Sequence, residues 1–161
     1  MHVRKMKQQD LASVSSICMK AFIHSVAPSL SSEGIDTFRG IAAEDSFSNR
    51  IKGDNTILVF EDEGKVKGVI ELKEGRHVAM LFVDPESQNK GIGNELISEV
   101  MAYARTKTIT VSASLNSVSA YLKYGFACTG EPDEKSGLKY QPMELELNKS
   151  SKKDALKRAS S

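Results

Sequence analysis

Apolar residues in the first third of the chain recur three or four positions apart, which is the spacing of one helix face. In the segment 10–22 an aspartate stands first, where the helix dipole favours an acid. The apolar residues of that segment are Leu11, Val14, Ile17, Ala21 and Phe22. The segment 24–55 keeps the spacing less regularly, at 35–42 and again at 47–51. We predict an amphipathic helix followed by a helical, lid-like stretch.

Between residues 56 and 83 the pattern becomes that of strands, with β-branched and aromatic residues in short runs. Two runs flank a polar connection at 61–65, which predicts a hairpin. A third run ends before Pro85, which would stop strand pairing. The predicted strands, expected to be consecutive and antiparallel, cover residues 56–60, 66–72 and 77–83.

The second half of the chain mixes both periods. Its predicted elements are helix 92–104, strand 108–113, helix 118–124 and strands 126–129 and 143–147. The resulting order is helix, helix, three strands, helix, strand, helix, two strands. This order predicts a mixed α/β (α+β) fold, and because no repeat or long linker interrupts residues 1–147, we predict one domain there.

Composition and charge narrow the function. The chain has 161 residues, of which 40% are hydrophobic and 27% charged, as expected for one globular domain. Residues 148–161 hold five basic residues and one aspartate, a charge of +4, so the net charge of +1 leaves −3 for residues 1–147. A mildly acidic body predicts no nucleic-acid partner. We expect the basic, serine-rich segment 148–161 to be a solvated, flexible tail.

Several other classes of protein are excluded at this stage. Apolar runs fall far short of the ~20 residues that a membrane span needs, and no secretory signal can be identified, so we expect a cytoplasmic protein with no membrane partner. Three scattered histidines show no ligand spacing, which predicts no metal site. We expect Cys18 and Cys128 to be free thiols that pack as small apolar side chains.

The segment 83–96 carries the clearest chemical signal. Gly91 and Gly93 lie between a predicted strand and a predicted helix. Glycine lets the backbone approach a ligand, and the first N–H groups of a helix attract anions, with Lys90 adding a positive charge. Leu96 stands where a dinucleotide-binding fold needs a third glycine, and no Gly-Lys-Ser/Thr follows. The loop is thus either a phosphate or pyrophosphate site of another type, or only a tight turn.

A second motif decides between these readings. Residues 121–126 read Tyr-Leu-Lys-Tyr-Gly-Phe, and residues 88–93 read Gln-Asn-Lys-Gly-Ile-Gly. With these two segments the sequence resembles the GNAT superfamily of acyl-CoA-dependent N-acetyltransferases, over residues 3–147. The resemblance implies the GNAT fold, whose central, mostly antiparallel sheet is splayed at the cofactor site and flanked by helices.

The resemblance also implies where acetyl-CoA would bind. The strand before the loop would pair with the pantetheine arm through Leu81, Phe82 and Val83, and one of its backbone N–H groups would stabilise the oxyanion of the tetrahedral intermediate. The loop would bind the pyrophosphate. Its residues are Gln88, Asn89, Lys90, Gly91, Ile92, Gly93 and Asn94.

Three further side chains take roles from the resemblance. Tyr121 is the candidate general acid that protonates the departing CoA thiolate, since a phenol with a pKa of about 10 is protonated at neutral pH. The family usually has an asparagine seven positions before this tyrosine, where this chain has Ser114, whereas Asn116 lies five positions before. Both Ser114 and Asn116 remain candidates for binding the pantetheine amides, and Tyr124 is expected to be a core aromatic.

The sequence does not assign the base that accepts the amine proton. The strand 108–111 offers no carboxylate, and the alternatives are Glu71, His77, His24 or ordered water. We expect the acceptor pocket to lie between an aromatic and histidine wall and the loop 131–139. The wall would comprise Phe22, His24, Phe38 and Phe47, and the acids expected to attract a cationic amine are Glu131, Asp133 and Glu134.

The leading hypothesis is an acetyl-CoA-dependent N-acetyltransferase that acetylates a primary amine of a small molecule or peptide directly, within a ternary complex. The alternative is a non-catalytic acyl-CoA-binding regulatory or interaction domain of the same fold, which the missing strand carboxylate favours. A plain interaction domain, with the glycine loop as a turn, is the third option. Dimers are common in the family, so the resemblance also allows a homodimer.

Overall fold

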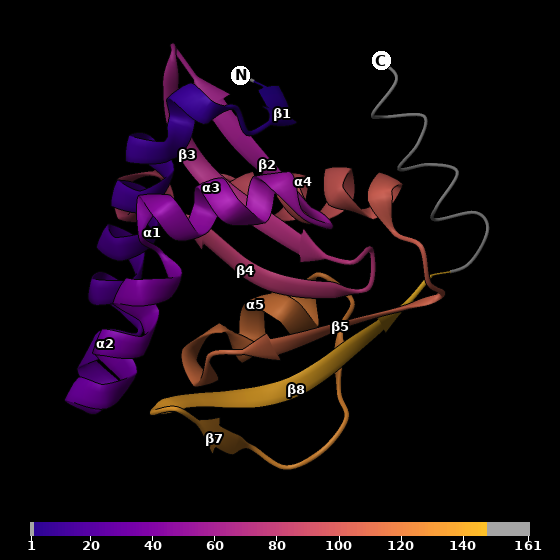
Figure 1. Cartoon of the computed structure of the whole chain (residues 1–161). Helices are drawn as coiled ribbons and strands as arrows, with labels where there is room; N and C mark the ends of the chain where they lie inside the picture. Colours follow the sequence, from indigo (N-terminus) through magenta and orange to yellow (C-terminus); the bar gives the residue numbers. More distant parts are fainter. Residues whose placement is uncertain (1, 148–161) are drawn as a thin grey trace.

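One mixed β-sheet runs through the part of the chain that the computed structural model describes, residues 2–147 (Figure 1). Within these residues the strand order is β1-β2-β3-β4-β5-β8-β6, and β7 pairs with β8. The strands are β1 (His2–Lys5), β2 (Asn55–Asp62), β3 (Lys65–Lys73), β4 (His77–Val83), β5 (Thr108–Ala113), β6 (Ala127–Cys128), β7 (Asp133–Lys135) and β8 (Leu138–Glu146).

Helices cover both faces of this sheet. The α-helices are α1 (Leu11–Ser25), α2 (Ser32–Ile41), α3 (Glu44–Lys52), α4 (Ile92–Val100) and α5 (Val118–Lys123). Short 3-10 turns are η1 (Gln8–Asp10), η2 (Ala27–Ser29), η3 (Pro85–Ser87), η4 (Met101–Tyr103) and η5 (Leu115–Ser117). The predicted mixed α/β fold is therefore confirmed.

The sheet parts between β4 and β5. All other neighbouring strands are antiparallel, including the three consecutive strands β2, β3 and β4. The parallel β4–β5 pair is joined only at His77 with Thr110 and at Val78 with Val111. Beyond Val78, β4 follows β3 while β5 follows β8, and Figure 1 shows the two halves of the sheet diverging. The expected splayed, mostly antiparallel sheet is present.

The two faces of the sheet bury separate cores because side chains along a strand alternate. Leu58 and Ile70 pack in the core that includes α4, whereas Val59 and Val69 pack in the core that includes α1, α2 and α3. The helical segment 24–55 thus forms α2 and α3 on the same face as α1 (Figure 1). This face and the parting of β4 from β5 together frame the candidate site.

The sequence pattern did not predict strand structure in two regions of the sheet. β1 consists of four residues, three of them basic, and Arg4 holds it in place by bonds to Asp10 at 2.8 and 3.0 Å and to Glu61 at 3.1 Å. Strand β8 begins at Leu138 rather than at residue 143, and β7 pairs with its first part. Strands β1 and β7 are mainly polar, and the first part of β8 alternates intermediate residues with exposed Lys139 and buried Gln141, so these stretches lack the apolar period that the prediction required.

Both cysteines are free, as predicted, but their surroundings differ. Cys18 is buried beside Met80, with its sulfur 3.9 Å from the thioether sulfur, and burial raises the pKa of its thiol. Cys128 is exposed on the edge strand β6. The prediction that both pack as small apolar side chains is therefore wrong for Cys128, because both residues of the short edge strand that carries it are exposed.

A buried ion pair ties α3 to the sheet. Glu71 on β3 is 0% exposed and accepts hydrogen bonds from Arg50 Nε at 2.8 Å and from Asn55 Nδ2 at 2.5 Å. The Arg50 guanidinium also lies 4.5 Å from the centroid of the Phe47 ring. Burying a carboxylate is costly unless a cation and hydrogen bonds compensate it, so this contact sets where α3 docks.

No helix within residues 2–147 is long and apolar enough to span a bilayer. The basic segment 148–161, expected to be a solvated tail, lies outside the residues that the structure describes.

Replacing Arg50 by methionine should lower the free energy of unfolding by about 3–5 kcal/mol, because the Glu71 carboxylate is left buried without its cation. The double variant Arg50→Met/Glu71→Leu should recover most of this loss, since both charges are then gone. Urea denaturation followed by circular dichroism measures both. A single variant as stable as the wild type would show that the pair does not hold α3.

Candidate active site

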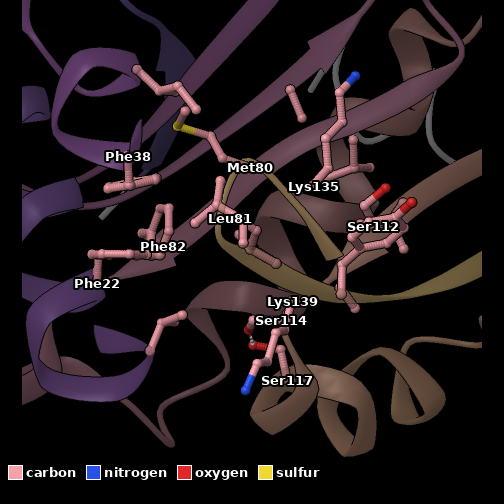
Figure 2. A pocket seen from close by; sticks show the side chains of 18 of the residues that line it. Phe22, Phe38, Met80, Leu81, Phe82, Ser112, Ser114, Ser117, Lys135 and Lys139 are labelled. Atoms are coloured by element: carbon pink, nitrogen blue, oxygen red, sulfur yellow. Dashed lines mark hydrogen bonds between the residues drawn. The ribbon is translucent and has the colours of Figure 1, made fainter. Parts of the chain in front are cut away.

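Two cavities open where β4 and β5 part. One, of about 600 Å³, is lined mainly by apolar residues, and we call it the apolar cavity (Figure 2). The other, of about 560 Å³, follows the segment 87–94, and we call it the loop cavity. Residues common to both linings are Val26, Leu81, Phe82, Ser117 and Tyr121. The cavities therefore meet where Ser117 and Tyr121, at the start and in the middle of the α5 region, face strand β4.

The loop cavity is built by the turn from β4 into α4. Asp84 holds the start of this turn, because one of its carboxylate oxygens accepts from the backbone N–H of Glu86 at 3.1 Å and lies 3.4 Å from Lys20 Nζ. The backbone then takes positive φ at Asn89 (66°) and at Gly91 (80°), just before α4 begins. The free N–H groups of the first turn of α4 thus border the cavity, a favourable place for an anion.

Most of the predicted loop residues line this cavity. They are Gln88, Asn89, Gly91, Ile92, Gly93 and Asn94. Lys90 belongs to the same turn but is not part of the lining.

Gly93 is required by a close contact with α5. A Cβ atom built there would lie 2.3 Å from the hydroxyl oxygen of Tyr124, too close for any side chain. Tyr124 is half-buried, lines the loop cavity and packs edge-on against Tyr121, with ring centroids 5.7 Å apart. The glycine therefore lets the two motifs, 88–93 and 121–126, come together.

Tyr121 occupies the junction of the two cavities. Its side chain is 5% exposed, and its ring also packs edge-on against Phe126 at a centroid distance of 5.3 Å. Burial raises the pKa of its phenol, so the group stays protonated throughout the neutral range. A neutral proton donor at the meeting point of two cavities suits general-acid chemistry.

Ser114 and Asn116 are placed in different cavities. Ser114 lines the apolar cavity, and its hydroxyl lies 2.6 Å from that of Ser117. Asn116 lines the loop cavity, and its amide donates a hydrogen bond to the backbone carbonyl of Ser25 at the end of α1. Ser117 lines both cavities, and the sequence analysis did not predict it. It precedes Tyr121 by four residues, which is the spacing of one helix face, so the sequence did contain a signal for it.

The predicted pantetheine strand also borders the site. Leu81 and Phe82 line both cavities, and Val83 lines the loop cavity. On its other side β4 pairs with β3, with a bulge that places Met80 opposite Glu71 but Val78 opposite Leu72. Ala79 is the extra residue, and it lines the apolar cavity. Bulges of this kind redirect backbone groups beside functional sites.

The apolar cavity has two chemically distinct sides (Figure 2). On one side Phe22 and Phe38 stack at 4.0 Å between centroids, and Phe38 meets Phe82 edge-on at 5.2 Å. On the other side the hairpin β7–β8 contributes Lys135 and Lys139. Within residues 2–147, no carboxylate and no histidine lines this cavity.

The three candidate bases lie elsewhere. Glu71 is held in the buried ion pair with Arg50, His77 Nδ1 lies 2.7 Å from the Thr110 hydroxyl, and His24 is exposed on α1. None of the three lines either cavity.

The expected acceptor wall is only partly present. Phe22 and Phe38 line the apolar cavity, whereas Phe47 is fully buried in the core beneath α3. The acids Glu131, Asp133 and Glu134 are exposed and are absent from both linings, whereas Lys135 and Lys139 from the same hairpin are present. Among residues 2–147 no group of three or more His, Cys, Asp or Glu side chains is arranged to hold a metal ion.

Comparison with known proteins identifies the family. Residues 26–147 match the acetyltransferase (GNAT) domain family. The chain belongs to the GNAT acetyltransferase family. The two motifs described above are the parts of this GNAT domain that line the loop cavity and the junction.

Solved structures of GNAT proteins share the fold. A GCN5-related N-acetyltransferase from Rhodopseudomonas palustris matches with a TM-score of 0.80 at 23% identity, over 91% of this chain and 95% of that one. The PaiA N-acetyltransferase from Thermoplasma acidophilum, solved with coenzyme A, gives 0.75 at 23% identity, over 91% and 98%. YncA from Salmonella typhimurium, solved with acetyl-CoA, gives a TM-score of 0.68 at 25% identity, over 92% of this chain and 94% of that one.

One curated relative is similar in sequence over a short stretch. The peptidyl-lysine N-acetyltransferase YiaC from Escherichia coli (strain K12) is 40% identical over 42 residues. The match spans 26% of this chain and 29% of the relative's length.

Replacing Gly93 by alanine should destabilise the protein by about 1–3 kcal/mol, because the new methyl group overlaps the Tyr124 hydroxyl. Adding Tyr124→Phe removes that oxygen and should restore most of the loss. Gly40→Ala is the matched control, since no atom of residues 2–147 lies within 4 Å of a Cβ at that helical position. Chemical denaturation of the four proteins tests this, and Gly93→Ala behaving like Gly40→Ala would contradict it.

Proposed function

We propose that the protein transfers the acetyl group of acetyl-CoA directly to a primary amine of a small molecule or peptide, within a ternary complex. The observation that supports this most strongly is the junction of the two cavities at Tyr121. A cofactor in the loop cavity and an acceptor in the apolar cavity would meet there from opposite sides.

The loop cavity suits the cofactor. Its glycine turn and the N-terminus of α4 offer backbone N–H groups and a favourable dipole to a pyrophosphate. The edge of β4 from Leu81 to Val83, which β5 has left, would pair with the amide groups of a pantetheine arm. Ser114, which lines the apolar cavity near the junction, and Asn116, which lines the loop cavity, are proposed as further partners for those amides.

The junction suits acyl transfer. A backbone N–H of β4 would hold the oxyanion that forms when the amine nitrogen attacks the thioester carbonyl. As the carbon–sulfur bond breaks, Tyr121 would give its proton to the leaving sulfur and later recover one from solvent. Releasing the proton of an alkylammonium with a pKa of about 10.4 costs about 4–5 kcal/mol at pH 7. Because no candidate base lines either cavity, ordered water is the proposed acceptor of this proton.

The same lack of a lining carboxylate or histidine favours a second candidate, a non-catalytic acyl-CoA-binding domain. Calorimetry with acetyl-CoA and a CoA-release assay over a panel of amines separate the two. Binding together with release supports the transferase, and binding without release from any amine supports the second candidate.

Replacing Tyr121 by phenylalanine should lower kcat for acetyl transfer by about 100-fold or more, while the Kd for acetyl-CoA stays within about twofold of wild type, because only the proton donor is lost. Since burial raises the pKa of Tyr121, wild-type activity should show no loss from its ionisation up to pH 10 or so. Tyr103→Phe, away from both cavities, is the control. Unchanged turnover in Tyr121→Phe across the pH range would remove it as the acid.

A further inference from the structure

We infer that the acceptor is a small amine that carries a carboxylate at its far end, joined to the amine by an apolar chain. This inference rests on the proposed function and specifies its substrate class. It reverses the electrostatics expected from the sequence, in which acids near the site were to attract a cationic amine.

The charges that reach the apolar cavity carry the argument. Lys135 and Lys139 are the charged residues of its lining within residues 2–147. Neither lysine is ion-paired with any of the described carboxylates. Lys139 faces Glu134 across the β7–β8 ladder, but the two charged groups do not approach to ion-pair distance, and Lys135 faces the apolar Leu138. Both lysines are exposed, and with no ion-pair partner among the described residues each can meet a bound anion.

The rest of the cavity accepts an apolar chain. The three phenylalanine rings gather on one side, and the labelled lysines and serines lie toward the other, as Figure 2 shows. A ligand that fills both sides has an apolar body and a negative end. The ammonium ends of Lys135 and Lys139 point to opposite sides of the view in Figure 2, so a ligand with a second ammonium would place that charge near one lysine or the other, which disfavours diamines.

One end of the cavity is closed by contacts between α2 and the turn of the β7–β8 hairpin. Thr37 of α2 donates a hydrogen bond to the Ser136 carbonyl at 2.8 Å, and both residues line the cavity. Next to this bond the backbones of Gly34 and Gly137 touch, since a Cβ at Gly34 would lie 2.2 Å from the Gly137 carbonyl oxygen. Helix α2 and the hairpin turn therefore close the cavity at this end, which suits a small molecule better than an extended chain.

The first test measures binding without turnover. Calorimetry compares hexanoate with hexanol, in the presence of CoA, for the wild type, Lys135→Gln, Lys139→Gln and the double variant. We expect hexanoate to bind about tenfold more tightly than hexanol, with about a threefold loss for each single variant and no remaining preference in the double variant. Lys65→Gln, at the exposed start of β3 and away from both cavities, should keep the full preference. Equal binding of the two ligands, or a preference that survives in the double variant, overturns the inference.

The second test measures turnover with amines of similar basicity. We expect kcat/KM to fall from ω-aminohexanoate to hexylamine to diaminohexane, and the order of the first and last to reverse in Lys135→Glu/Lys139→Glu. Acetylation of all three at equal rates would leave the proposed function standing and overturn the acceptor class. Lysine-dependent binding of hexanoate with no acetylation of any amine would support the anion site and count against the proposed reaction.

Discussion

The site depends on a gap in the sheet. β4 and β5 share only two register pairs and then separate, so the backbone of β4 from Met80 onward has a partner strand on one side alone. Backbone N–H and C=O groups that lose a strand need another partner or water, and an extended ligand rich in amides supplies both donors and acceptors. The parting also creates the space of both cavities. Without it, the glycine loop and the apolar wall would belong to separate parts of the surface.

Much of the fold was predictable because the central elements have strong local periods. The strands from residue 55 to residue 83 and the helices α1 and α4 are apolar enough for their pattern to identify them. The strands β1 and β7 were not, since edge strands are short and polar and owe their position to contacts such as Arg4 with Asp10. Tertiary pairing, which the local pattern does not contain, decides where such strands form.

The candidate site likewise has one part that the sequence predicts and one part that it does not. The loop 88–94 was predictable because its glycines, its strand and its helix are contiguous in sequence. The character of the apolar cavity was not, since the segment 131–139 holds three acids followed by two lysines, and only the hairpin geometry decides which of them reach the cavity. Glu71 is a similar case: it could be taken for a strand-end base, but Arg50, 21 residues earlier, holds it in the core.

The contact between Gly34 and Gly137 has a consequence for how this protein can change. These residues are 103 positions apart, and their backbones meet with no side chain between them. One end of the apolar cavity is therefore closed by a contact between two residues that contribute no side chain to it. A single added methyl group at either position would move α2 and the hairpin apart and enlarge the opening, while every side chain in the lining kept its identity. In the proposed reaction, the size and the chemistry of the acceptor would thus depend on different residues, and each could be altered without the other.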